Sequence, residues 1–273
     1  MSQPLIVDGG LARRIEEATA KSNAHMVEAR HRLSPQVNAE WRQFGSLFAV
    51  YDGLASPLTQ TFGLGVDDGD IAYQLSEAES FFDHKQAPVF HEVCPLISAA
   101  HMAELSSRHY RPIELSNVLY QKLDSVPSQR WAPGIQLRVL ERTEADAWAQ
   151  VSADGWGEYP EYRDFLLDLG KVIVETTSSV SFWVEEGGAP IATGSLFILD
   201  GVGILGGAST IPNARRKGAQ QLLLRERLQF AKDQGCDLAT MSALPGSPSQ
   251  RNAQRNGFHI AYTRTKWMRD RVQ

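Results

Sequence analysis

One stretch of this chain, from Val202 to Gly235, limits most strongly what the rest can fold into. It begins with an apolar run to Ile211 that contains three glycines, which predicts a strand with a bulge or a close backbone approach. Pro212 ends this strand, a basic segment ending at Gly218 follows, and a helix-forming run then stops near Gly235. This order of strand, basic glycine turn and helix predicts an anion-binding site.

The basic turn consists of Arg215, Arg216, Lys217 and Gly218. The first N–H groups of a helix have no partner within the helix, and the helix dipole adds positive charge there. A diphosphate satisfies these N–H groups, the glycine allows close approach, and the three cations add charge. The spacing fits neither a P-loop nor the GxGxxG of a dinucleotide site. An alternative stays open, in which a solvated basic turn simply starts a helix.

The basic turn resembles the R-x-x-G-x-G/A motif of the GNAT N-acyltransferase superfamily. The match runs from Arg215 to Gln220, and Gln220 replaces the last small residue of the motif. Further along, a short helix that ends in Asn256-Gly257-Phe258 and runs into a strand resembles a second block of the same superfamily. Two blocks in the superfamily's order make residues 136–268 similar to these enzymes.

The resemblance implies a site for acetyl-CoA as cosubstrate and no metal. Pantetheine would pair with the strand backbone near Thr210 and Ile211, and the diphosphate would lie on the basic turn. The thioester would lie where this strand splays from the strand expected at 237–242. The implied cofactor-binding residues are Thr210, Ile211, Arg215, Arg216, Lys217, Gly218, Ala219, Gln220, Gln221 and Ser249.

Direct transfer of an acyl group from the thioester to an amine sets three requirements. The ammonium must lose a proton, the tetrahedral oxyanion needs a donor, and the departing thiolate needs an acid. Many superfamily members supply that acid from a Tyr four residues before the Gly-Phe pair, where this chain has Ala253. Ser242, Ser249 and Tyr262 are alternatives that the sequence does not separate. We therefore assign no catalytic acid or base.

An aromatic and acidic segment precedes this region and carries Trp156, Tyr159 and Tyr162. In GNAT enzymes the corresponding region often lines the acceptor pocket, so the resemblance implies that these aromatic residues bind the acceptor. In the alternative, the three rings pack a helical lid onto the sheet. The acceptor is expected to be an amine of a small molecule or of a protein, and the sequence does not identify it.

The first half of the chain repeats the order of elements in the second half. Aligning the two halves places His109-Tyr110 on Gly257-Phe258, as an internal repeat would. In the alternative, two ordinary α/β halves have the same order of elements by convergence. We predict an α/β (α+β) fold of two GNAT-like domains, each a mixed, mainly antiparallel sheet flanked by helices. Residues 1–123 form a degenerate first domain, 124–134 a linker rich in Pro and Ser, and 135–273 the acetyl-CoA-binding domain.

The individual elements follow from periodicity and from turn residues. The first half is expected to contain helices at 11–33, 71–85 and 99–108 and strands at 41–51, 57–66, 88–94 and 110–122. The place of the basic turn is taken there by Asp67-Asp68-Gly69-Asp70. Aspartates at a helix start satisfy its N–H groups and repel an anion, so the first domain should bind no CoA.

Composition narrows the classes of protein further. Of the 273 residues 42% are hydrophobic and 22% charged, which is ordinary for a soluble globular protein. The formal charge of -5 shows no excess of basic residues of the kind that binds nucleic acid or an anionic membrane. Two cysteines, Cys94 and Cys236, make no disulfide framework, and no apolar run predicts a membrane span or signal peptide. We expect a cytoplasmic protein, a monomer or homodimer.

The leading function from the sequence is an acetyl-CoA-dependent N-acetyltransferase. Ala253 and the degenerate first half favour a second class, a non-catalytic acyl-CoA-binding or regulatory protein. A third class binds phosphate or a nucleotide at the basic turn, and for it ADP would compete as well as CoA does. The sequence does not establish whether longer acyl-CoAs are used.

Overall fold

The structure, a computed structural model, describes residues 6–67, 69–96, 99–124 and 134–269. The helices are α1 Gly9–Leu33, α2 Ile71–His84, α3 Ala99–Ser107, α4 Ala145–Asp154, α5 Arg163–Glu175, α6 Ala219–Asp233 and α7 Pro248–Arg255. The strands are β1 Glu40–Phe44, β2 Leu47–Tyr51, β3 Gln60–Phe62, β4 Val89–Val93, β5 Arg111–Lys122, β6 Ile135–Val139, β7 Ser179–Glu186, β8 Ala189–Leu199, β9 Val202–Thr210, β10 Leu238–Ala243 and β11 His259–Arg269. Short 3-10 helices cover Pro35–Val37, Arg142–Glu144, Pro160–Tyr162 and Pro212–Ala214. Most of the predicted linker lies outside the described residues.

All of these strands form one sheet, in the order β1-β2-β3-β4-β11-β5-β10-β9-β8-β7-β6. Neighbouring strands are antiparallel except for two pairs, β3–β4 and β9–β10, which are parallel. The first half has three antiparallel strands, β1 to β3, and the second half has four, β6 to β9. In each half the last of these strands pairs in parallel with the next strand, and a helix connects the two. The predicted mixed, mainly antiparallel α/β fold with two similar halves is confirmed.

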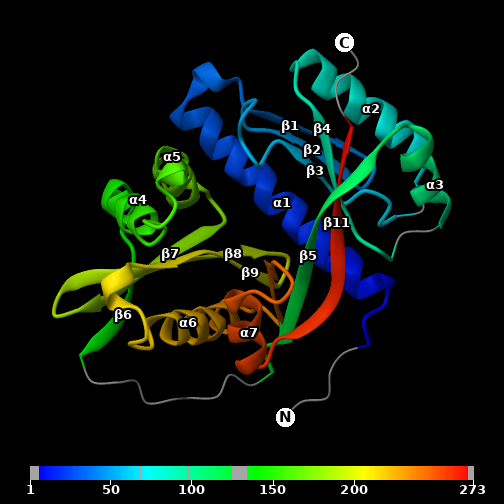
Figure 1. The fold of residues 1–273 in the computed structure, drawn as a ribbon. Coiled ribbons are helices and arrows are strands. Elements are labelled where there is room, and N and C mark those ends of the chain that lie inside the picture. Colours follow the sequence, from blue (N-terminus) through cyan, green and yellow to red (C-terminus); the bar gives the residue numbers. More distant parts are fainter. Residues whose placement is uncertain (1–5, 68, 97–98, 125–133, 270–273) are drawn as a thin grey trace.

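The two halves exchange a strand at the centre of the sheet. β5 comes from the first half but pairs with β10, and β11 comes from the second half but pairs with β4. β5 and β11 also pair with each other, and Figure 1 shows them side by side between the halves. The predicted segments 1–123 and 135–273 consequently share one sheet, and α1 of the first segment packs in one core with α4 and α5 of the second.

Alternating side chains of β7 explain how helices cover both faces of this sheet. Phe182 and Val184 join a core with the apolar side of α6, whereas Trp183 joins a core with α1, α4 and α5. Successive residues of a strand point to opposite faces, so these three buried residues require a helix on each side. Trp148 of α4 fixes one layer by donating a hydrogen bond of 3.0 Å from its indole N–H to Phe182 O.

Two predicted strands of the first half were too long. The predicted strand 41–51 is a hairpin of β1 and β2, because Gly45 between them has a φ of 62°. The predicted strand 57–66 is reduced to β3, because Gly63 and Gly65 have φ values of 78° and 70°. All three φ values are left-handed conformations that an extended strand does not contain. The other helices and strands listed in the prediction agree with the structure to within one or two residues at each end.

Candidate active site

A gap opens in the sheet where β9 and β10 separate. The two strands pair only from Val202↔Leu238 to Ile204↔Thr240, and both then continue for several residues without pairing to each other. A cavity of about 320 Å³ occupies this gap, and we call it the splay cavity. A second cavity of about 690 Å³ lies over the basic turn. Both are lined by Trp156, Ala208, Gln220, Ser249 and Asn252, so they adjoin each other.

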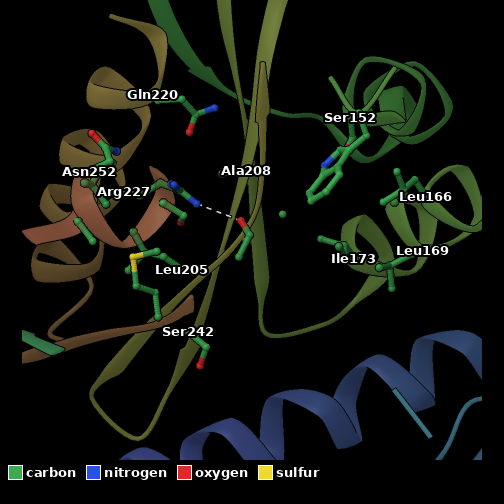
Figure 2. A pocket seen from close by; sticks show the side chains of 18 residues that line it. Ser152, Leu166, Leu169, Ile173, Leu205, Ala208, Gln220, Arg227, Ser242 and Asn252 are labelled. Carbon is green, nitrogen blue, oxygen red and sulfur yellow. Dashed lines mark hydrogen bonds between the residues drawn. The ribbon is translucent and has the colours of Figure 1, made fainter. Parts of the chain in front are cut away.

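Residues from both faces of the sheet line the splay cavity (Figure 2). Ser152, Leu166 and Leu169 come from α4 and α5 on one side, and Gln220 and Arg227 come from α6 on the other. Such a passage through a sheet lets two molecules meet from opposite faces. The predicted splay is therefore present and is large enough to hold a reacting group.

The predicted bulge lies on β9 beside this cavity. Thr193 pairs with Ser209 and Ser195 pairs with Gly206, so the single residue Gly194 on β8 faces two residues of β9. One of these is Gly207, whose φ is 58°. A side chain at Gly207 would begin 3.3 Å from the ring of Trp148, so crowding and backbone conformation both require glycine there. A bulge turns backbone N–H groups out of the ladder and toward the gap.

The start of α6 is open. Gly218 is its N-cap residue with a φ of 86°, and no side chain caps the helix. A Cβ built on Gly218 would meet nothing within 4 Å, so the backbone conformation and not crowding explains the glycine. The free N–H groups and the positive end of the dipole therefore face the cavity over the basic turn.

The three cations of the basic turn are not equivalent. Arg215 donates to Glu158 Oε1 at 2.9 Å and to Gly155 O at 3.0 Å, which ties the turn to the segment between α4 and α5. Lys217 forms an ion pair with Glu186 at 2.6 Å. Arg216 lines the cavity and forms no ion pair with any described residue. Arg216 is thus the cation with its charge available to a ligand.

The remaining predicted CoA residues divide into two groups. Thr210, Ala219, Gln220, Gln221 and Ser249 line the cavity over the basic turn, whereas Ile211 and Lys217 line neither cavity. The Ile211 N–H donates to Ile191 O at 3.1 Å, which is part of the pairing with β8. Because alternate residues of a strand direct their backbone groups to opposite neighbours, the backbone of Thr210 faces the gap.

Two of the three predicted acceptor residues line the cavities. Trp156, Tyr159 and Tyr162 are 44%, 48% and 51% exposed, and neighbouring rings are 6.2 and 6.3 Å apart between centroids. Trp156 lines both cavities, Tyr159 lines the one over the basic turn, and Tyr162 lines neither. Rings that remain about half exposed do not pack a lid onto the sheet.

The candidate acids also separate in space. Ser242 and Ser249 line the splay cavity together with Ala253. Tyr262 is buried in the central part of the sheet, where its hydroxyl donates to Glu16 at 2.7 Å, and burial raises its pKa far above the ordinary value. Tyr262 is therefore not a candidate acid for the splay cavity.

Sequence reasoning missed Asn252 and Arg227, which both line the splay cavity. Arg227 lies on the apolar side of α6 between Leu223 and Ala231, so a charge at a core position was the available signal. Asn252 gave no such signal, because it sits in a short polar helix.

The corresponding helix start in the first half is capped by a side chain. The Asp70 carboxylate caps α2 by accepting from Ala72 N at 2.9 Å and Tyr73 N at 3.2 Å. Asp67 accepts hydrogen bonds from Ser46 Oγ, Gly69 N and Gln74 Nε2. The prediction of an internally capped helix is confirmed for Asp70, and Asp68 lies outside the described residues.

The comparisons agree with this geometry. Residues 140–258 match the model of the acetyltransferase (GNAT) family, so the second half carries a GNAT acetyltransferase domain. No curated protein matches the chain. Similar solved structures include a GCN5-related N-acetyltransferase from Kribbella flavida, with 17% identity, a TM-score of 0.69 and 96% of each chain covered. Another, from Sphaerobacter thermophilus, has 17% identity, a TM-score of 0.57 and coverage of 94% of this chain and 93% of that one.

A third similar structure is a tandem GNAT protein from the clavulanic acid biosynthesis pathway, with 13% identity and a TM-score of 0.58. The match covers 83% of this chain and 79% of that chain. At these identities the likeness establishes the fold, and it extends over both halves. Within the described residues, no helix has the length and apolar character to cross a bilayer, and no group of acidic, His or Cys side chains is placed to hold a metal ion.

Proposed function

We propose that this protein transfers an acetyl group from acetyl-CoA to an amine of a small molecule or of a protein. The observation that carries the proposal is the uncapped start of α6 directly beside the gap between β9 and β10. A diphosphate on the N–H groups of this helix would place the pantetheine arm along β9, which leads into the splay cavity. In this arrangement residues 135–273 hold the cosubstrate, and residues 1–123 form a unit without a cofactor.

The bulge at Gly207 is our candidate for the oxyanion donor. The amine nitrogen would form a bond to the thioester carbon, the C–S bond would break, and the developing oxyanion would accept from a bulge N–H group. Of the side chains that line the splay cavity, Arg227 is the titratable one, and none is Asp, Glu, His, Cys, Lys or Tyr. Water would then carry the proton from the ammonium to solvent and return one to the thiolate.

This arrangement has a consequence for pH. An acceptor amine with a pKa near 10 is mostly protonated at neutral pH, and among the described residues no carboxylate or imidazole lines the splay cavity. Glu158, which lines the adjoining cavity, is held in an ion pair with Arg215. The rate kcat/KM for the acceptor should therefore rise about tenfold per pH unit between pH 7 and 9. A plateau near pH 6 to 7 would instead indicate a protein base.

Two measurements test the proposal. Titration calorimetry with acetyl-CoA tests binding, and release of free thiol in the presence of a panel of amines tests turnover. ADP serves as a comparator, since a nucleotide-binding protein would bind ADP as tightly as CoA. No binding of acetyl-CoA would overturn the proposal.

A second function, acyl-CoA binding without turnover, is favoured by one observation. Ala253 occupies the place of the expected acid and is buried against the splay cavity. Binding of acetyl-CoA with no thiol release for any amine would select this function. We further propose that the protein is cytoplasmic and a monomer or homodimer, in keeping with its two free and buried cysteines.

A further inference from the structure

Arg227 is a buried charge without a carboxylate partner among the described residues. It is 3% exposed, and burial lowers the pKa of its guanidinium to about 10, which leaves it positively charged at neutral pH. Its side chain extends from α6 toward β9 (Figure 2). The other buried arginines behave differently, because Arg30 pairs with Asp52 and Arg264 pairs with Glu16.

Three backbone carbonyls hold the guanidinium in place. Nε donates to Leu223 O at 3.0 Å, and Nη1 donates to Ser195 O at 2.8 Å and Gly206 O at 3.0 Å. These bonds occupy the Nε and Nη1 donors and leave Nη2 without a described partner. A Cβ at Gly194 would lie 3.1 Å from the guanidinium carbon, so the glycine opposite the bulge gives the group its room.

A purely structural role does not require the charge. Neutral donors also bond carbonyl groups, and burial of an unpaired charge costs more than burial of an amide. Arg227 lines the splay cavity, and no acidic side chain is among the residues that line this cavity with it. A ligand that brings a carboxylate would supply the missing countercharge, and the Nη2 N–H groups, which make none of these three bonds, would donate to it.

We infer that Arg227 binds a carboxylate of the substrate inside the splay cavity. This inference rests on the proposed acyl transfer and gives its substrate class, namely a donor or an acceptor that carries a carboxylate. The carboxylate has two sources. It is either the end of a dicarboxylic acyl group on CoA, or the carboxylate of an amino acid whose amine is acylated.

Matched pairs of ligands distinguish these sources in the wild-type protein. Succinyl-CoA is compared with butyryl-CoA, which has the same chain length and no charge, and an amino acid is compared with its carboxamide. In one of the two pairs, we expect the ligand that carries the carboxylate to be preferred by about tenfold or more in Kd or kcat/KM. The neutral ligand of that pair loses the charge-assisted hydrogen bonds. Preferences below twofold in both pairs would overturn the inference.

Variants on α6 then assign the preference to the residue. Arg227→Gln should abolish it, and Arg227→Lys should keep part of it. Arg225→Gln removes the same charge from the same helix at a position that does not line the cavity, and it should keep the preference. A preference that survives Arg227→Gln would also overturn the inference.

If Arg227→Gln does not fold, the ligand pairs are compared between the wild type and Arg227→Lys, and that comparison decides. Failure of acetyl-CoA itself to bind would overturn the proposed function, which the carboxylate comparison does not test.

Discussion

Helices α2 and α6 follow equivalent strands in the two halves but begin in opposite ways. At α2 the Asp70 side chain occupies the free N–H groups, and Asp67 adds a second carboxylate nearby. At α6 the N-cap is Gly218, and the N–H groups stay open beside Arg216. The fold is the same, so the capacity to bind an anion depends on the few residues before each helix.

A second difference lies in the helices that cover one face of the sheet. The second half has α4 and α5, and the segment between them carries the exposed aromatic rings beside the cavities. The first half has a single unbroken helix, α1, in which the buried pair Arg30–Asp52 ties the helix to the loop after β2. This difference in the covering helices is the reason why we place the proposed acceptor site in the second half.

The strongest test of the comparison places a carboxylate at the start of α6. Gly218→Asp should weaken binding of acetyl-CoA about a hundredfold or more, because the charge repels the diphosphate and the side chain competes for the N–H groups. Gly218→Asn has nearly the same shape and tolerates a positive φ equally well, so it should weaken binding much less. Calorimetry measures both, and equal losses would show that shape and not charge matters at this position.

The aromatic segment provides the next largest effect. Trp156→Ala and Tyr159→Ala should raise the KM of the acceptor roughly tenfold, since each removes a ring contact at the cavity mouth. Tyr162→Ala is the control, because Tyr162 is as exposed as Tyr159 but lines neither cavity. Steady-state kinetics with both substrates varied separates this from an effect on acetyl-CoA. A rise for Tyr162→Ala equal to that for Tyr159→Ala would contradict the assignment.

The cap of α2 should matter for stability and not for binding. Asp70→Ala should lower the free energy of unfolding by about 1 kcal/mol, because two N–H groups lose their acceptor. Asp70→Ser keeps a capping oxygen and should lose less. Urea unfolding gives the stability, and calorimetry should give an unchanged Kd for acetyl-CoA. A weaker Kd in either variant would mean that the first half contributes to the cofactor site.

The last prediction concerns the stoichiometry of binding, because we expect no second molecule of acetyl-CoA to bind. Titration of the full chain with acetyl-CoA should give a stoichiometry near one, because the first half is capped internally. A second site of comparable affinity would contradict the proposal that only the second half binds acetyl-CoA. The test requires the full chain, since removing the first half would also remove β5 from its place between β10 and β11.

Much of this architecture could be predicted from local residues. The basic turn, Gly218 and the block at Asn256-Gly257-Phe258 predicted the second half, and His109 matches Gly257 in both position and positive φ. The strand exchange could not be predicted, because both β5 and β11 carry the pattern of a paired strand and nothing local specifies the partner. Arg227 was missed for a similar reason, since its contacts are to backbone groups far away in sequence.

The exchanged strands also affect how the chain reaches its fold during synthesis. β11 is made after every other described strand, yet it lies between β4 and β5, which emerge much earlier. Until it arrives, β4 and β5 of the first half both expose unpaired backbone edges, and such edges pair readily with other chains. The first half therefore cannot finish folding before the second half has been made. Exposed edges of this kind favour association with other chains until synthesis is complete.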